Sequence, residues 1–263
     1  MFYDCHTHSS ISSDSQTPMA DMVRAARQMG LFGITITEHV DIGFPAQHCT
    51  VADLELYKKT YQQVAEDNAD YPVLLGVELG YEYGREEESA QYVKDLDPDF
   101  VINSVHSMDD MTLFCDEIYP AGLEHKTYSH YLEKVRDSID GCIDYDAIGH
   151  IGFVAKKALY PDPMLRYYEF ADQLDDILIR LIETGHALEA NTSGYRNCRD
   201  TLPETAILRR YRQLGGELLT LGSDAHVTEY VGFHFPDAAE HIRSCGFRYI
   251  THYEKRKPVM LPL

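Results

Sequence analysis

Features of several common protein classes are missing from this sequence of 263 residues. It has no run of about 18 apolar residues, so we expect no transmembrane helix and no membrane partner. The opening residues MFYDCHTHSS have neither a basic segment nor an apolar core, so we expect no secretory signal. No repeat, low-complexity stretch or Pro/Gly/Ser-rich linker divides the chain, and we expect a single domain over residues 1–263.

Positive charge is scarce. The chain has 23 Lys and Arg residues against 43 Asp and Glu residues, which gives a formal net charge of −20. Nucleic-acid binding relies on Lys and Arg that neutralise phosphates, so we expect no nucleic-acid partner. A small phosphate ester is not excluded, because bound metal ions reverse the sign of the field locally.

The spacing of the cysteines matches no disulfide framework and no zinc-binding motif. There are six of them and none is paired as CxxC, so we expect neither disulfides nor a zinc knuckle but reduced thiols in a cytoplasmic protein. The 13 histidines carry more information, because many of them follow apolar runs directly.

Short apolar runs alternate with longer amphipathic ones. The expected strands are Phe2–Cys5, Gly33–Thr37, Val73–Val77, Phe100–Val105, Tyr145–Gly149, Ala187–Ala190 and Leu218–Leu221. The expected helices are Pro18–Met29, Val51–Asp67, His125–Ile139, Tyr167–Thr184, Pro203–Leu214 and Pro236–Cys245. Strand–helix alternation predicts a parallel sheet, and seven such units favour one α/β barrel over two small domains. A last short strand near Arg248–Ile250 is expected to pair where the barrel closes.

Nearly every expected strand ends in a residue type that binds metals. These residues are His6, His8, Glu38, His39, Glu78, His106, His150, Asp224 and His226. Since barrel active sites lie at the C-terminal ends of the strands, residues far apart in sequence converge there. Imidazole and carboxylate together suit zinc, iron or manganese, and the candidates are too many for one tetrahedral zinc. Glu78 is placed to bridge two ions.

Each signal has an ordinary explanation when it is taken alone. A lone histidine is more often a polar residue without a ligand role, and GSDAH also suits a helix cap. Their joint occurrence at successive strand ends favours a multinuclear metal site. We expect structural roles for the remaining histidines: His48, His125, His130, His186, His234, His241 and His252. For His48 and His234 a place at the mouth of the barrel is an open alternative.

The motifs HTHSS, ITEH, GVELG, SVH, IGH and GSDAH occur in the order of the PHP (polymerase and histidinol phosphatase) family, which this sequence resembles over its whole length. The segments FYDCHTHSSISSDS, LEANTSGYR and GSDAH resemble the histidinol-phosphatase branch. The resemblance implies a distorted (β/α)7 barrel, similar to a TIM barrel, with the metal site at the C-terminal ends of the strands.

The resemblance also implies a ligand set for two or three divalent ions of zinc, iron or manganese. One ion would be held by His6, His8, Glu78 and Asp224, and Glu78 would bridge to a second held by His106 and His150. A third would be held by Asp14, His39 and His226. Many relatives have His in place of Asp14.

The activity implied is phosphomonoester hydrolysis, with L-histidinol phosphate converted to L-histidinol and phosphate in histidine biosynthesis. We expect a hydroxide that bridges two metals to attack phosphorus, and Asp224 or His226 to protonate the leaving group. Arg196, Lys156 and Ser193 are the expected substrate contacts, with Lys157 and Ser223 as weaker candidates.

Three other functions compete with this hypothesis. One is a PHP phosphoesterase acting on phosphotyrosine, a nucleotide or an oligonucleotide end. Another is a metal-dependent amide or ester hydrolase, although such barrels commonly use a bridging lysine where this chain has Glu78. The last is a non-catalytic metal-binding module. The sequence does not decide the native metal or the oligomeric state.

Overall fold

The computed structural model describes residues 2–44 and 51–263, so the structural role expected for His48 and the reduced thiol expected for Cys49, one of the six cysteines, lie outside it. Its main sheet has the order β1-β2-β3-β4-β7-β8-β9-β10-β11. The parallel members are β1 (Tyr3–Thr7), β2 (Gly33–Val40), β3 (Val73–Gly80), β4 (Phe100–Ser104), β7 (Ala147–Ile148), β8 (Ala187–Asn191) and β9 (Leu219–Gly222). A separate small hairpin joins β5 (Ser107–Met108) to β6 (Met111–Thr112).

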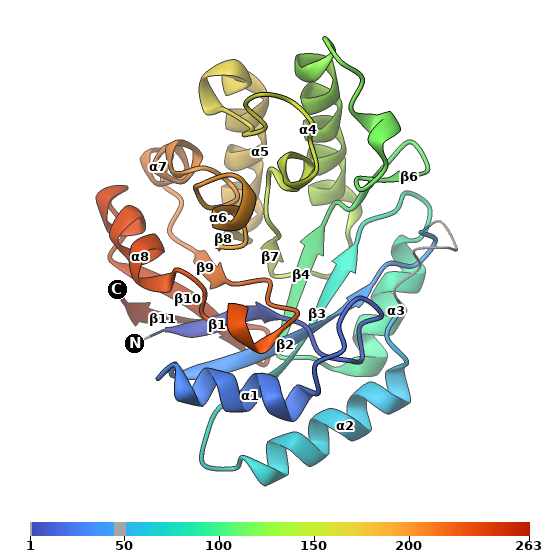
Figure 1. Ribbon diagram of the computed structural model, residues 1–263, viewed down its shortest axis with the longest axis vertical. Helices are drawn as coiled ribbons and strands as arrows, with labels where there is room; N and C mark the ends of the chain where they lie inside the picture. The colour runs from blue at the N-terminus through green and yellow to red at the C-terminus, as the bar shows by residue number, and fades with distance from the viewer. Residues whose placement is uncertain (1, 45–50) are drawn as a thin grey trace.

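The sheet closes on itself through the segment that follows β9. The amide of Asp224 donates to the carbonyl of His6, and the amide of His8 donates to the carbonyl of Ala225, both at 2.8 Å. The seven parallel strands therefore form a barrel surrounded by helices, as Figure 1 shows. The predicted α/β barrel of seven units is confirmed.

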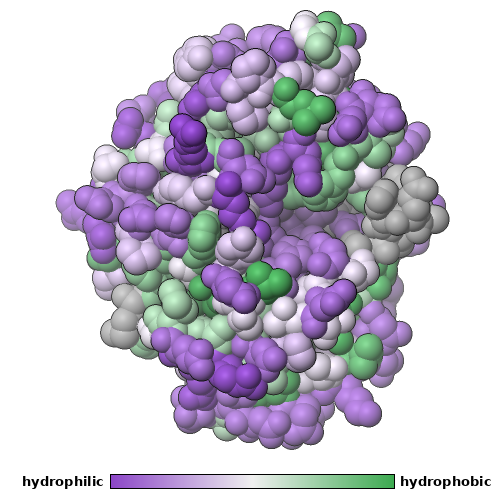
Figure 2. Space-filling view, viewed as in Figure 1, coloured by the Kyte–Doolittle hydropathy of each residue, from purple (hydrophilic) through white to green (hydrophobic). Residues whose placement is uncertain are grey.

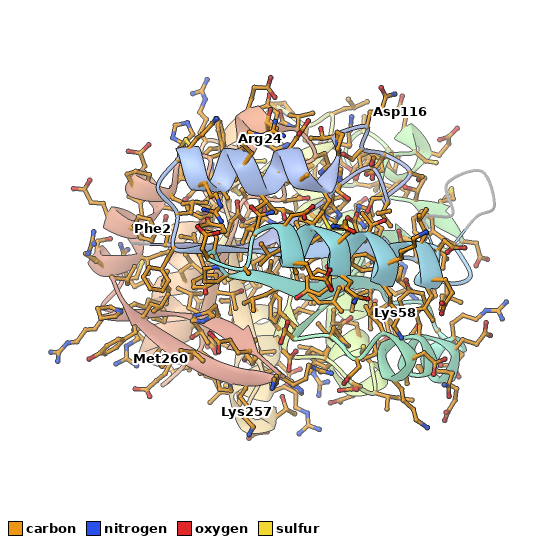
Figure 3. All side chains as sticks on the ribbon, turned by 90° about the horizontal axis from the view of Figure 1, so that it is seen from below. Phe2, Arg24, Lys58, Asp116, Lys257 and Met260 are labelled. Atoms are coloured by element: carbon orange, nitrogen blue, oxygen red, sulfur yellow. The ribbon has the colours of Figure 1, made fainter. Side chains whose placement is uncertain are left out.

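The helices follow the expected order. They are α1 (Met19–Gln28), α2 (Leu54–Asp67), α3 (Glu86–Leu96), α4 (Glu124–Gly141), α5 (Ala171–Thr184), α6 (Gly194–Asn197), α7 (Thr205–Gln213) and α8 (Phe235–Ser244). Helices α1 and α2 lie side by side across the outside of the strands, with Arg24 on the first and Lys58 on the second (Figure 3). Gly30, Gly185, Gly215 and Gly246 have positive φ after helices, as predicted for C-terminal caps.

Two differences from the predicted elements bear on the site. Helix α3 was not predicted, because its sequence EEESAQYVKDL buries only Ser89, Val93 and Leu96 and so has a weak apolar stripe. The strands β2 and β3 also continue to Val40 and Gly80, beyond the predicted ends. His39 and Glu78 therefore lie within strands, where the ladder fixes their backbones.

Apolar side chains fill the barrel at the end opposite the C-terminal ends of the strands. The last two strands, β10 (Tyr249–Glu254) and β11 (Lys257–Pro262), form a hairpin, and β10 also pairs in parallel with β9. The expected strand near residues 248–250 thus does pair where the barrel closes, but it is longer. Tyr253 from β10 stacks on Phe100 with ring centroids 5.1 Å apart, in a buried cluster with Tyr3 and Ile102. This apolar floor leaves the polar residues at the other end.

Replacing Phe100 with Ala should lower the free energy of unfolding by about 3–5 kcal/mol, because a buried aromatic side chain is lost and a cavity remains. Phe100 is 1% exposed. Urea denaturation measures the loss, and Tyr83→Ala is the control, since Tyr83 is 91% exposed and its loss should change stability by less than about 0.5 kcal/mol. Equal stabilities of the two variants would contradict this account of the floor.

Candidate metal centre

Ionisable side chains meet in a pocket of about 510 Å³ at the C-terminal ends of the strands. On this face the molecular surface is hollowed near its middle, and hydrophilic residues gather around the hollow (Figure 2). All the ligands that the family resemblance implied are brought together here. Three of them, His6, His39 and Glu78, lie within strands, where the sheet holds the backbone and little freedom remains to be lost on binding an ion. The others lie in the segments that follow the strands.

Glu78 occupies the centre of the cluster and is fully buried. One carboxylate oxygen, Oε1, lies 2.7 Å from Nε2 of His150 and 3.2 Å from Nε2 of His106. The other, Oε2, lies 3.3 Å from Nε2 of His6 and 3.5 Å from Nε2 of His8. Oε2 also lies 2.9 Å from Nδ1 of His39. The two oxygens therefore face different histidines, which is the arrangement that a bridging carboxylate requires.

A second carboxylate, that of Asp224, completes one side of the cluster. Its Oδ1 lies 3.5 Å from Nε2 of His8 and 3.9 Å from Nε2 of His6. Asp224 has a φ of 54°, in the left-handed region, at the turn that closes the barrel. The closing turn thus aims this carboxylate at the histidines of β1.

The third expected group also assembles, nearer the surface. Oδ2 of Asp14 lies 3.0 Å from Nε2 of His226 and 3.4 Å from Nε2 of His39. The ring of His8 stacks against the rings of both His39 and His226, with both centroid distances 4.2 Å, and the centroids of those two rings lie 5.6 Å apart. Because the Asp14 side chain is 48% exposed, this part of the cluster is the most open to solvent.

Two of the candidates chosen from sequence point elsewhere. Glu38 is buried, but its carboxylate accepts hydrogen bonds from the backbone amides and hydroxyls of Ser9 and Ser12. Since neighbours on a strand face opposite sides, His39 points into the pocket and Glu38 away from it. The hydroxyl of Ser223 donates to Asp4 at 2.6 Å, so it does not face the pocket.

Two buried carboxylates behind the histidines were missed by the sequence reasoning. Oδ1 of Asp41 lies 2.9 Å from Nδ1 of His106, and Oε1 of Glu189 lies 2.7 Å from Nδ1 of His6. Glu189 lies within LEANTSGYR, and an acidic residue inside a buried strand was the signal available. Such outer carboxylates orient metal-binding histidines.

The cluster fits cations because its polar atoms do not satisfy one another. Nε2 of His6 and Nε2 of His8 face each other at 3.1 Å. Nδ1 of His39 is 2.9 Å from Oε2 of Glu78, yet the two are not aligned for a hydrogen bond, and within the described chain both buried atoms lack a hydrogen-bond partner. A buried polar atom without a partner is costly, and divalent cations among these donors would remove that cost.

In the metal-free protein, the carboxylates and histidines of the cluster shift one another's pKa values. Burial alone lowers the pKa of His106, but the carboxylates of Glu78 and Asp41 together raise it to about 9. The pKa of His6 is likewise raised well above its usual value by Glu78 and Glu189, against the effect of burial. Burial raises the pKa of Glu78, but the surrounding histidines hold it well below its usual range.

These shifts predict a pH dependence for metal binding. In the metal-free protein the raised pKa of His106 contributes stability below about pH 6.5, and this contribution is lost as the pH rises through about 9. Metal must displace those protons, so its affinity should increase steadily from about pH 6 to 9 with proton release. Competition with a chelator of known affinity at each pH measures it. A metal affinity independent of pH would contradict the assigned ligands.

The expected substrate contacts line the same pocket. Nζ of Lys156 is paired with Oδ2 of Asp224 and lies 4.5 Å from the centre of the Phe153 ring. Nη2 of Arg196 donates to the backbone carbonyls of Ser223 and Asp224, both at 2.9 Å, so this side chain also supports the closing turn. The hydroxyl of Ser193 donates to Oδ1 of Asn191 at 2.6 Å.

The pocket walls also include apolar surface that sequence reasoning did not identify. Phe44, Phe114 and Phe153 line the pocket, and Nζ of Lys157 lies 5.3 Å from the centre of the Phe114 ring. Phe114 is 52% exposed, and exposed aromatic rings beside a polar cluster suit a ligand with a flat apolar part. The arrangement therefore combines a metal centre, cations and an aromatic wall.

Comparison with known proteins places this site in a family. The sequence matches the PHP domain over residues 4–193. It is 28% identical over 260 residues to the probable histidinol-phosphatase of Clostridium acetobutylicum, covering 97% of this chain and 98% of that protein. It is also 28% identical over 255 residues to the histidinol-phosphatase of Lactococcus lactis, covering 97% and 95%.

Solved structures agree with these matches. The crystal structure of histidinol phosphate phosphatase from Lactococcus lactis, complexed with zinc, L-histidinol and phosphate, superposes with a TM-score of 0.91, at 27% identity and with 98% of both chains covered. A putative histidinol phosphatase from Listeria monocytogenes shares the fold, with a TM-score of 0.73, 20% identity and coverage of 89% of this chain and 99% of that one. Among the residues that the structure describes, no helix is long and apolar enough to span a membrane. Since the domain match extends over more than half of its length, this chain belongs to the PHP domain family.

Proposed function

We propose that this protein hydrolyses L-histidinol phosphate to L-histidinol and phosphate, a reaction of histidine biosynthesis. The observation that carries the proposal is a buried Glu78 whose two oxygens face different histidines, in the same open pocket as Lys156. The relative in Lactococcus lactis, which matches along nearly the whole chain, bears the name of this activity. The proposed reaction is thus phosphomonoester hydrolysis by a metal-dependent enzyme.

The cofactor is a set of divalent metal ions, for which we propose two or three ions of zinc, iron or manganese. His6, His8 and Asp224 would hold one, His106 and His150 a second, with Glu78 between them. The more exposed group of Asp14, His39 and His226 would hold the third. When bound, such ions supply a nucleophile at neutral pH and neutralise phosphoryl oxygens.

The chain's own side chains bind the substrate and handle the proton. Lys156 and Arg196 place positive charge at the pocket, where a dianionic phosphate needs it, and Ser193 adds a hydroxyl. Of the two candidate proton donors, Asp224 is the less suitable, because Lys156 and the nearby histidines hold its pKa well below its usual range although burial opposes this, and an ionised carboxylate has no proton to give. His226, whose side chain is 24% exposed, is better placed to protonate the leaving alkoxide.

The proposal includes three properties of the whole protein. Residues 1–263 act as one barrel domain. The partner is a small phosphate monoester rather than nucleic acid, in line with the net charge of −20. The protein works in the cytoplasm, which is supported by the free thiols of Cys5, Cys115, Cys142, Cys198 and Cys245 among the described residues.

Phosphate release by the protein reconstituted with manganese, zinc or iron tests the function. L-histidinol phosphate should be turned over with a kcat/KM far above that for p-nitrophenyl phosphate, phosphotyrosine or nucleotides. Turnover of the other esters alone would keep the metal site and exclude the histidine pathway. A metal-replete protein that hydrolyses none of them would contradict the proposal.

Replacing Lys156 with Met should raise KM for the phosphate ester by about 10–100-fold, because a charge-assisted hydrogen bond contributes about 1.5–3 kcal/mol. The apolar stem over Phe153 is kept while the charge is lost. Steady-state kinetics measures the change, and Lys157→Met is the matched control, since Nζ of Lys157 lies over Phe114 instead. An unchanged KM for Lys156→Met, or a larger effect at Lys157, would contradict the assignment.

A further inference from the structure

Glu189 is a buried carboxylate that the proposed reaction does not yet use. It lies in β8 and is 1% exposed. Its Oε1 is 2.7 Å from Nδ1 of His6, and its Oε2 accepts from the backbone amide of His150 at 2.7 Å and from Nδ2 of Asn191 at 3.1 Å. One side chain thus contacts residues of three separate strand ends.

The contact with His6 selects which ring nitrogen faces the cluster. Once an incoming ion has displaced the proton from Nε2, the remaining proton on Nδ1 is donated to Glu189 and the Nε2 lone pair points towards Glu78 and Asp224, at 3.3 and 3.9 Å. An imidazole binds a cation through a nitrogen without a proton, so this hydrogen bond leaves His6 in the form that binds.

Through its contact with the backbone of His150, Glu189 also restrains a histidine on the other side of Glu78. The amide of His150 is fixed by Oε2, and its ring Nε2 lies 2.7 Å from Oε1 of Glu78. His6 faces the other oxygen of Glu78. A single carboxylate therefore restrains one histidine on each side of the proposed bridge.

Gly222 makes room for the contact between Glu189 and His6. A Cβ at Gly222 of the neighbouring strand β9 would lie 2.5 Å from Oε1 of Glu189 and 2.5 Å from Cβ of His6. The absence of a side chain at residue 222 is what permits the contact between Glu189 and His6. The carboxylate fits a space built by its neighbours, and its negative charge is aimed at the cluster.

We propose that Glu189 is a positioning residue, which sets the orientation and tautomer of His6, fixes the backbone of His150 and so increases the affinity of the barrel for its divalent ions. This inference rests on the proposed metal site but not on the identity of the substrate. It predicts an effect on metal binding that is measurable without any phosphate ester.

The test replaces Glu189 with Gln, which keeps the volume but removes the charge and turns one acceptor into a donor towards the His150 amide. Zinc affinity, measured by competition with a chelator, should fall by about 10–100-fold, the usual range for outer-shell partners. At saturating zinc, kcat for histidinol phosphate should fall while KM changes little. Turnover of other esters only would count against the substrate, and the zinc measurement would still decide the role of Glu189.

Glu204→Gln is the matched control. Glu204 is also buried, at 6% exposure, but its carboxylate contacts Arg166 and the amide of Tyr167. It should lower thermal stability while leaving zinc affinity unchanged. Equal zinc affinities of Glu189→Gln and wild type would overturn the proposal, as would equal losses in both variants.

A measurement on the wild type keeps the test decisive if Glu189→Gln does not fold. Long-range ¹⁵N–¹H spectra of the zinc-loaded, histidine-labelled protein should show a proton on Nδ1 of His6 and none on Nε2. A zinc-loaded His6 protonated on Nε2 would overturn the proposal.

Discussion

The variant Glu78→Gln should lose at least about 10³-fold in kcat/KM, since metal ions contribute several kcal/mol to such reactions and each 1.36 kcal/mol is about tenfold. Glu78 is the residue whose two oxygens face different histidines. Its amide analogue keeps the shape but loses the negative charge, and it replaces one of the two oxygens by an N–H donor that cannot bind a cation. The bound metal, measured by elemental analysis, should fall together with the rate.

The natural comparison for Glu78 is Glu38→Gln. Both carboxylates are fully buried, and both follow apolar runs in the sequence. Glu38 is held by Ser9 and Ser12 instead of facing the histidines, so the Glu38 variant should retain its metal. If Glu78→Gln kept full metal content and full rate, the proposed centre would be wrong.

Removal of the metals by a chelator should abolish hydrolysis and destabilise the fold, and added manganese, zinc or iron should restore both. An ion present at about 1,000 times its Kd stabilises the folded state by about 4 kcal/mol. For a chain of this size that corresponds to a rise in Tm of roughly 8–16 °C. Differential scanning calorimetry with and without chelator measures the shift.

The physical reason for this large effect is that buried polar atoms of the cluster lack partners when no metal is bound. Nδ1 of His39 and Oε2 of Glu78 are buried and lack hydrogen-bond partners within the described chain, and the Nε2 atoms of His6 and His8 lie only 3.1 Å apart. Phe100→Ala provides a control, because its lower Tm should still rise by a similar amount when metal is added. Full activity in protein shown to be free of metal would exclude this mechanism.

The pattern of ligand types in the sequence was sufficient to predict a barrel with a metal site at one end. Strand–helix alternation needs no tertiary information, and in a parallel barrel every strand ends at the same mouth. His106 and His150 could therefore be grouped although no local motif connects them. Asp14 came only from the resemblance to the PHP family, because it lies in a loop where periodicity carries no information.

Local sequence could not separate Glu38 from Glu78. Both directly follow the last residue of a predicted strand, Thr37 for Glu38 and Val77 for Glu78, and their different directions depend on the register of β2 and β3. Glu189 was overlooked for the related reason that the hydrogen bonds of a buried carboxylate are made to residues distant in sequence, here His6 and His150.

The sequence by itself determined the fold class, the family and the ligand types, since these depend on hydrophobic periodicity and on motifs that each occupy a few consecutive residues. Only the tertiary structure decided which carboxylates face the cluster and which support it from behind. That distinction depends on where a side chain points once the barrel closes between β1 and β9, and on the space left by Gly222. Hydrogen-bond direction and steric room are properties of residues brought together in space, and no stretch of sequence contains them.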